Sequence, residues 1–415
     1  MLKFIFALLI IVVMARLVGF LALCIGQPRV VGEMVAGIIL GPSILGSLVP
    51  LINETFNSMS DVLYLLSQLG LALYMFVVGL ELDHKVFVKK NIINSGFLAI
   101  SGILPTFLLV FGTSMILYDH FNLIKIDRVD FSIFMASGFS LTAFPMLARI
   151  LQERNLSTKR FGVISLLAAS IDDIVAWILL AVVTIIIQAG DLRSCLYILF
   201  KLSIFMAFSL CILKPVVYKL ILKNEENIQS KFTIGLVVFL LCVFSTEYIG
   251  IHAVFGGFIA GLIIPKKESV SLEIKEKLED FVIIFLVPIF FMYTGLQTRL
   301  DIFSSVSILG PLVIYLIVAT IGKYVACTIA TRILGFSWRD ASAVGALMNA
   351  RGLMILMFGN IGITSGLMTT EIFSIIVVTA IVTTASTYPI FNLSYPLEQK
   401  KILIRNYYKR KKEIS

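Results

Sequence analysis

The chain has 415 residues, of which 59% are hydrophobic and only 14% are charged. Soluble proteins carry about 25% charged residues, so this composition excludes an ordinary soluble domain and indicates an integral membrane protein. The net charge of +9 does not indicate nucleic-acid binding, because the basic residues cluster in short loops between apolar segments. The five cysteines and three histidines are scattered, so we expect no disulfide framework, no metal cluster and no cofactor.

Apolar stretches long enough to cross a bilayer recur along the whole chain and predict an all-α membrane protein with about 13 transmembrane helices. In chain order they are 3–25, 30–49, 60–81, 93–118, 131–152, 160–188, 195–222, 231–249, 251–265, 279–297, 306–333, 340–363 and 371–394. The first stretch is long for a signal peptide and lacks a clear small-residue cleavage site, so we expect a retained helix. The ninth is the shortest.

Basic residues are distributed unequally between the two sides of this predicted bundle. The loops after odd-numbered segments, together with the tail 395–415, hold 25 of the 34 lysines and arginines, and the opposite loops hold five. The positive-inside rule then places the N-terminus outside and the C-terminus in the cytoplasm, as expected for the plasma membrane. The short basic tail is expected to lie against anionic lipid.

The two halves of the chain are related by an internal repeat, about 30–188 and about 251–394. Because the second copy starts from the opposite side of the membrane, the repeats are inverted, a pattern typical of secondary transporters. The matching pairs are VGEMVAGIILGP (31–42) with FGGFIAGLIIP (255–265), MFVVGLELD (75–83) with MYTGLQTRLD (292–301), and SGFSLTAFPMLARIL (137–151) with VGALMNARGLMILMF (344–358).

One helix in each repeat is predicted to be interrupted at matching places. Proline lacks a backbone donor and disfavours helix at the preceding residue, and irregular backbone at membrane depth is tolerated only beside protein or a water-filled cavity. Freed carbonyls and hydroxyls there suit a small dehydrated cation, although a packing kink is the simpler alternative. The marking residues are Ser140, Thr142 and Pro145 in the first repeat, and Asn349, Arg351 and Gly352 in the second.

Two adjacent acids, Asp172 and Asp173, lie within the apolar segment ISLLAASIDDIVAWILLAVVTIII. Acids at this depth are expensive and indicate a functional site. Neighbours on a helix differ by about 100°, so the two carboxylates cannot point the same way. A carboxylate for which a proton and a metal cation compete is sufficient for an exchanger. A structural pair at a helix end is the alternative, and the apolar residues on both sides argue against it.

Lys323 is equally deep in the eleventh segment and requires an acidic partner. Only the two aspartates are available, so we expect Asp172 to pair with Lys323 and Asp173 to bind the ion. Snorkelling of Lys323 to the cytoplasmic side is the alternative. Arg351, the other deep base, is expected either to neutralise carbonyls at the second break or to pair with an acid of the first repeat.

SLTAFPMLARIL followed by ASIDDIVAWILLA resembles the monovalent cation:proton antiporters of the second large branch, which include bacterial sodium/proton antiporters, potassium-efflux systems and plant cation/proton exchangers. GLELD, Gly322–Lys323, NARGLM and GNIG extend the resemblance over about 26–392. It implies an inverted-repeat antiporter fold with two crossed unwound helices, a homodimer, and a core domain that moves like an elevator. It also implies that Asp173 binds the ion beside Asp172 and that Lys323 pairs with Asp172.

The resemblance predicts a secondary antiporter, not an enzyme, that exchanges Na⁺ or Li⁺ for protons across the bilayer. Potassium-efflux relatives and plant exchangers commonly have Gln or Asn at the position of Asp172, so an acid there favours electrogenic sodium exchange. A K⁺/H⁺ antiporter is the main alternative, and an uncoupled channel of the same fold is another. An intramembrane aspartyl protease is disfavoured because its acids face each other from different helices. No GxGxxG motif follows the last helix, so we expect no nucleotide-binding domain.

Overall fold

The computed structural model describes residues 1–81, 89–121, 126–153, 156, 159–189, 192–223, 227–250, 252–265, 268–304 and 306–395, and their regular secondary structure is helical. Nine helices in these ranges are long and apolar enough to cross a membrane, and shorter apolar helices accompany them. The all-α membrane fold is therefore confirmed, whereas the count of 13 spans stays a prediction. The basic tail predicted at 395–415 lies, apart from its first residue, outside the described residues.

The helices follow the predicted segments closely. The first half contains α1 (Leu2–Cys24), α2 (Arg29–Leu40), the short α3 (Leu45–Leu48) and α4 (Pro50–Asn57), α5 (Ser60–Glu81), α6 (Lys89–Leu117), α7 (Arg128–Ser140), α8 (Phe144–Glu153) and α9 (Arg160–Ala189). The second half contains α12 (Ile228–Ile249), α13 (Ala253–Ile263), α14 (Glu268–Phe281), α15 (Val287–Gln297), α16 (Val306–Ile333), α17 (Trp338–Leu347), α18 (Gly352–Thr364) and α19 (Thr370–Ser394). Between them lie α10 (Leu192–Phe208) and α11 (Lys214–Lys223).

Two predicted segments continue through π-helical turns. Residues Ser209–Leu213 join α10 to α11, and residues Val282–Leu286 join α14 to α15. The predicted span 279–297 is thus the second part of a longer helical rod whose first part, α14, begins at Glu268 and is polar. A hydropathy criterion misses that part because charged residues occupy it.

The glycines of the predicted repeat motifs lie at two close helix crossings. Helix α2 crosses α15 where Gly37 meets Gly295, and helix α5 crosses α13 where Gly79 meets Gly261. A Cβ atom on Gly295 would lie 1.9 Å from the Gly37 carbonyl oxygen, and one on Gly261 would lie 2.7 Å from the Gly79 Cα. Small residues permit such close approach of membrane helices. The motif glycines of each repeat therefore contact those of the other repeat.

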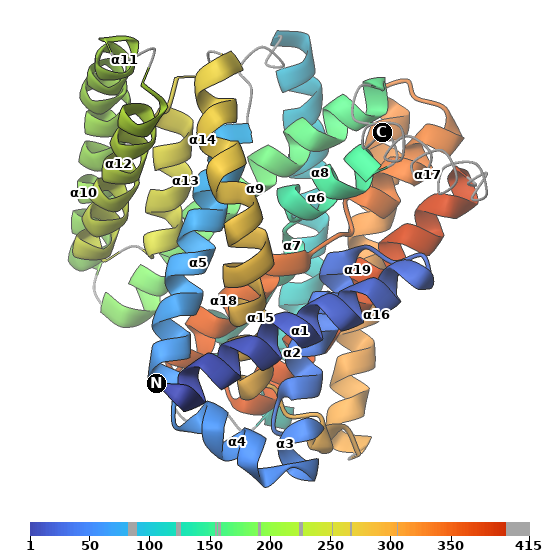
Figure 1. The fold of residues 1–415 in the computed structure, drawn as a ribbon. Helices are drawn as coiled ribbons and strands as arrows, with labels where there is room; N and C mark the ends of the chain where they lie inside the picture. Colours follow the sequence, from blue (N-terminus) through green and yellow to red (C-terminus); the bar gives the residue numbers. More distant parts are fainter. Residues whose placement is uncertain are drawn as a thin grey trace, which may run out of the picture.

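Helices α6 and α16 are the centre of a second group of packed helices. These two helices contact each other extensively, α7 and α9 pack on α6, and α17 packs on α16. Helices α10 to α12 lie at one edge of the molecule and α16 with α17 at the other (Figure 1). At the front, α1 runs obliquely over α2, and Arg16 of α1 forms an ion pair with the buried Glu33 of α2 at 3.6 Å. Arg16 therefore faces a neighbouring helix.

Candidate functional site

The two interrupted helices cross at their breaks. Helix α7 ends at Ser140 and α8 begins at Phe144, with Pro145 as its second residue, while α17 ends at Leu347 and α18 begins at Gly352. The backbone amide of Ala143 donates to the carbonyl of Ala350 at 2.9 Å, and the Thr142 hydroxyl donates to the carbonyl of Met348 at 2.7 Å. Backbone groups freed by each break are therefore partly satisfied by the other break.

Gly352 occupies a position that only glycine suits. Its φ angle is +47°, in the left-handed region, and a Cβ atom there would lie 2.3 Å from Cγ of Met146. Its backbone amide donates to the Thr384 hydroxyl at 3.0 Å. The start of α18 is thus held against both the first break and α19.

Asp172 and Lys323 form a fully buried ion pair. The Lys323 Nζ lies 2.8 Å from Oδ2 of Asp172, and both side chains have 0% exposure. The same ammonium donates to the carbonyl of Ser140 at 2.7 Å, at the last residue of α7. Lys323 does not snorkel to the cytoplasmic side. It joins α9, which carries the acid, to the first break.

Asp173 has a different environment from its neighbour. Both of its carboxylate oxygens are buried and have no hydrogen-bond partner among the described residues. The amide of Phe144, at the start of α8, lies toward this carboxylate outside hydrogen-bonding geometry. A helix N-terminus carries partial positive charge and favours a nearby anion. Asp173 therefore keeps its oxygens available to a proton or a cation.

The polar residues of the second break bind to α16. Arg351 donates to the Ala319 carbonyl at 2.6 Å and to Oδ1 of Asn349 at 3.4 Å, and the Asn349 amide donates to the Thr320 carbonyl at 3.3 Å. No acid contacts Arg351 within the described part of the chain. Arg351 therefore contacts neither of its predicted partners among the described residues, because the carbonyl that accepts its hydrogen bond belongs to the continuous helix α16 and not to the second break.

The candidate cation ligands already form hydrogen bonds within the protein. Ser140 Oγ donates to the Ser137 carbonyl at 3.0 Å, and the Thr142 hydroxyl is also used as a donor. Their oxygen lone pairs could still accept a cation. The Asn349 oxygen faces Arg351, which disfavours a cation at that atom.

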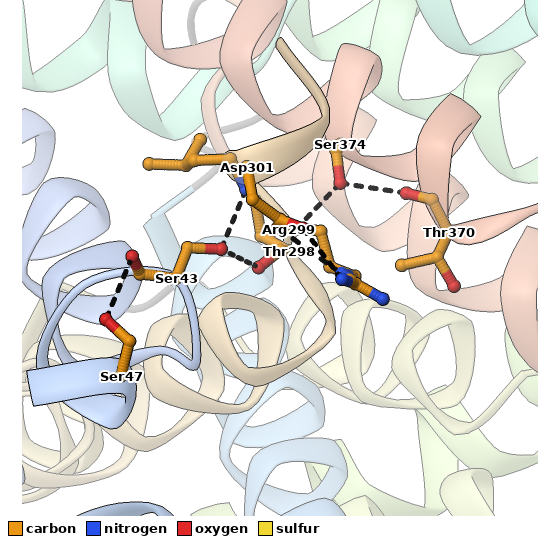
Figure 2. Close-up of polar contacts among 8 residues, drawn as sticks. Ser43, Ser47, Thr298, Arg299, Asp301, Thr370 and Ser374 are labelled. Carbon is orange, nitrogen blue, oxygen red and sulfur yellow. Dashed lines mark hydrogen bonds and ion pairs between the residues drawn. The ribbon is translucent and has the colours of Figure 1, made fainter. Parts of the chain in front are cut away.

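At one end of the bundle, polar residues join the chain after α15 to the end of α2 and to α19 (Figure 2). We call this group the seam. The seam consists of Ser43, Thr298, Arg299, Leu300 and Ser374. The Leu300 amide donates to Ser43 Oγ at 2.8 Å, and the Arg299 amide donates to Ser374 Oγ at 2.9 Å. The chain after α15 is thereby tied both to the end of α2 and to α19. Beside it, a pocket of about 450 Å³ is lined by residues of all three elements.

A second polar contact joins α15 to α18. The Asn360 amide donates to the Thr294 hydroxyl at 3.1 Å, and both residues are buried. Sequence reasoning did not single out this contact or the seam. The GNIG pattern contains Asn360, and a carboxamide within an apolar helix was the available signal.

The family follows from comparison with known proteins. Residues 8–393 match the family model described as sodium/hydrogen exchanger, transmembrane. The chain belongs to this family. It is thus a multi-pass membrane protein of a cation/proton antiporter family, which consists of transporters and not enzymes.

Relatives named for different cations resemble this chain over nearly its whole length. The Na(+)/H(+) antiporter NhaS4 of Synechocystis is 36% identical over 94% of this chain and 96% of its own length. The K(+)/H(+) antiporter 1 of Saccharomyces cerevisiae is 32% identical over 95% of this chain. The chain spans 46% of that yeast protein's length and 50% of that of cation/H(+) antiporter 19 of Arabidopsis thaliana, which is 35% identical.

The fold is that of a solved antiporter. The structure of the sodium proton antiporter MjNhaP1 from Methanocaldococcus jannaschii matches with a TM-score of 0.66, over 95% of this chain and 97% of that chain. The sequence identity is 13%, so this likeness shows the fold alone. The predicted inverted-repeat antiporter fold with crossed unwound helices is therefore confirmed.

Proposed function

We propose that this chain exchanges Na⁺ or Li⁺ for protons at Asp173, with Asp172 and Lys323 as the coupled second proton site. The observation that carries the proposal is the contrast between two adjacent buried acids. Asp172 is neutralised by Lys323 at 2.8 Å, whereas neither oxygen of Asp173 has a partner in the described part of the chain. A buried carboxylate without a partner requires a proton or a cation.

The exchange is proposed to be electrogenic. When a cation binds, Asp173 gives up its proton, and the cation's charge competes with the Lys323 ammonium for the neighbouring Asp172, so the ion pair breaks and Lys323 also releases a proton. On the other side the cation leaves, and protonation of Asp173 and of Lys323, with re-formation of the pair, would carry two protons back per cation. The relatives include proteins named as Na(+)/H(+) and as K(+)/H(+) antiporters, so K⁺/H⁺ exchange is the second candidate.

Alternating access would require the seam and the Asn360–Thr294 contact to open. We propose that the core helices α6 to α9 and α16 to α19 move together against α2, α5, α13 and α15, in a homodimer of the plasma membrane. The N-terminus would lie outside and the C-terminus in the cytoplasm, which places the seam on the external side. The excess of basic residues at the opposite end of the bundle supports this orientation.

The test is exchange in proteoliposomes with an imposed pH gradient, titrated with Na⁺, Li⁺ and K⁺. Asp173→Asn should abolish exchange, because an amide cannot alternate between a proton and a cation. Asp280→Asn, at an exposed acid of α14, is the matched control and should exchange normally. Normal exchange by Asp173→Asn would refute the site assignment.

Charge movement separates the coupling schemes. With the membrane potential clamped at different values, an electrogenic exchanger changes its rate with potential, and an electroneutral one does not. Electroneutral exchange by the wild-type protein would contradict the role of Asp172 and Lys323 as a second proton site. Higher apparent affinity for K⁺ than for Na⁺ would favour the second candidate.

A further inference from the structure

An apolar groove runs along the outer surface of the molecule between α6 and α16. Its volume is about 560 Å³, and residues such as Leu104, Leu109 and Ile321 line it. On α6 it extends from Phe97 to Leu109, and on α16 from Ile321 to Ile333. Each stretch covers 12 residue steps, or about 18 Å of helix. This is close to the depth of one leaflet, about half of a hydrocarbon core of roughly 30 Å.

The open end of the groove carries basic and aromatic residues. Arg332 and Trp338 are exposed there, with the Arg332 guanidinium carbon 5.4 Å from the centroid of the Trp338 ring. One of the guanidinium nitrogens donates to the Phe336 carbonyl, which leaves other donors for an anion. Helix α6 begins at the same end with Lys89 and Lys90. An exposed arginine beside an aromatic ring is typical of contacts with anionic lipid headgroups at the membrane interface.

The inner end of the groove lies behind the buried ion pair. Gly322 lines the groove, and the next residue is Lys323. On α6, a Cβ atom added to Gly102 would lie 3.3 Å from the Lys323 Nζ and 2.6 Å from the Cys327 sulfur. Small residues therefore separate the groove from Lys323. Whatever fills the inner end of the groove packs close to the back of this lysine.

We propose that the groove binds one acyl chain of an anionic phospholipid, whose phosphate contacts Arg332 and Trp338. The apolar lining offers water almost no hydrogen-bond partners, so a hydrocarbon chain is the favourable occupant. The length of one leaflet fits a single chain that runs from the headgroup level to the midplane. The basic mouth distinguishes this site from the ordinary lipid contacts of other helices, because it selects the headgroup as well as the chain.

The test measures lipid selectivity at a single tryptophan. Trp177→Phe and Trp338→Tyr remove both native tryptophans while keeping an aromatic ring at the mouth. Val325→Trp then reports on the groove, and Val237→Trp on α12 is the matched control, since the native valines are 43% and 57% exposed. Helices α12 and α16 lie at opposite edges of the molecule (Figure 1). Each reporter is quenched by dibrominated phosphatidylglycerol titrated into phosphatidylcholine bilayers.

At the groove reporter we expect a preference for phosphatidylglycerol over phosphatidylcholine of about fivefold, which corresponds to one basic residue near the surface. At the control reporter the ratio should be about one. Adding Arg332→Gln should reduce the preference at the groove to about one, whereas Lys201→Gln on α10 should leave it unchanged. Equal ratios at the two reporters, or a preference that survives Arg332→Gln, would overturn the proposal.

Discussion

The buried ion pair between Asp172 and Lys323 allows a quantitative test of how the site is held together. Both side chains have 0% exposure, and the ammonium also donates to the Ser140 carbonyl. Removing one partner of a buried pair leaves the other charge uncompensated and costs about 3–5 kcal/mol. Asp172→Asn should therefore lower the free energy of unfolding by about 3 kcal/mol. Lys323→Met should cost about 1 kcal/mol more, because it also leaves the Ser140 carbonyl without its donor.

The double variant distinguishes pairing from two independent contributions. Asp172→Asn with Lys323→Met removes both charges, and replacing a buried pair by uncharged residues of similar volume is often nearly neutral. The double variant should thus cost less than either single variant, so the coupling energy should exceed about 4 kcal/mol. The measurement is reversible unfolding in mixed micelles, followed by circular dichroism. Lys201→Met, on the partly exposed lysine of α10, is the control and should change stability by less than about 0.5 kcal/mol.

Additivity would refute this reasoning. If the double variant costs the sum of the two single variants, the two charges contribute independently, and the pair does not couple α9 to α16. Loss of exchange would not by itself decide the question, because the same residues are proposed to carry protons. The unfolding measurement isolates the structural contribution from the transport cycle.

Further predictions concern the seam, the helix crossings and the surface ion pair. Ser374→Ala removes the hydroxyl of α19 that accepts from the Arg299 amide, which costs about 1 kcal/mol and should favour the opened state about fivefold. A cysteine introduced in the adjacent pocket should then be labelled faster by a thiol reagent. Ser43→Ala is the control and should leave the labelling rate unchanged, because Ser43 links the chain after α15 to α2, and these two elements are proposed to stay together. Gly37→Ala should destabilise the protein by at least about 1–3 kcal/mol, because its Cβ would lie 2.1 Å from a carbonyl oxygen, whereas Gly112→Ala meets nothing within 4 Å and should unfold no more easily than wild type. Arg299 and Asp301 form an exposed ion pair at 2.7 Å, and both line the pocket beside the seam, where a cation would enter from outside. The hydrogen bond from Arg299 lowers the pKa of Asp301 below its ordinary 3.8, so the negative charge of Asp301 is present above that value and is lost only as the pH falls through the lowered one. Asp301→Asn should therefore have the same effect on external cation affinity at pH 5.5 and at pH 8.

The sequence was sufficient to predict both helix breaks. Pro145 and the group Asn349–Arg351–Gly352 stand out because apolar membrane helices otherwise contain few residues that cannot continue a helix. The pairing of Lys323 with an aspartate was also predictable, since a deep charge requires a counter-charge and few were available. In both cases the free energy of an unsatisfied group in lipid is large enough to leave a clear signal in the residue types.

The contacts that position the breaks could not be predicted in the same way. Thr142 donates to the carbonyl of Met348, and Arg351 donates to the carbonyl of Ala319. Every residue carries a carbonyl, so the acceptor leaves no trace in the sequence. The seam presents the same difficulty, because serines in membrane helices usually bond to their own helix, as Ser374 also does with the Thr370 carbonyl. Only the packed structure shows that Ser374 also accepts from Arg299.

Helix α16 connects these contacts into one unit. Lys323 of α16 binds Asp172 of α9 and the Ser140 carbonyl at the first break. One turn earlier, carbonyls of α16 accept hydrogen bonds from Arg351 and Asn349 of the second break. Because both breaks are also bonded to each other, neither can shift without α16. A displacement of the Asp173 site across the bilayer would therefore carry α16 with it, together with the wall of the lipid groove. An acyl chain held there would travel with the ion site, so lipid selectivity at the groove and the rate of exchange should respond together to changes in Arg332.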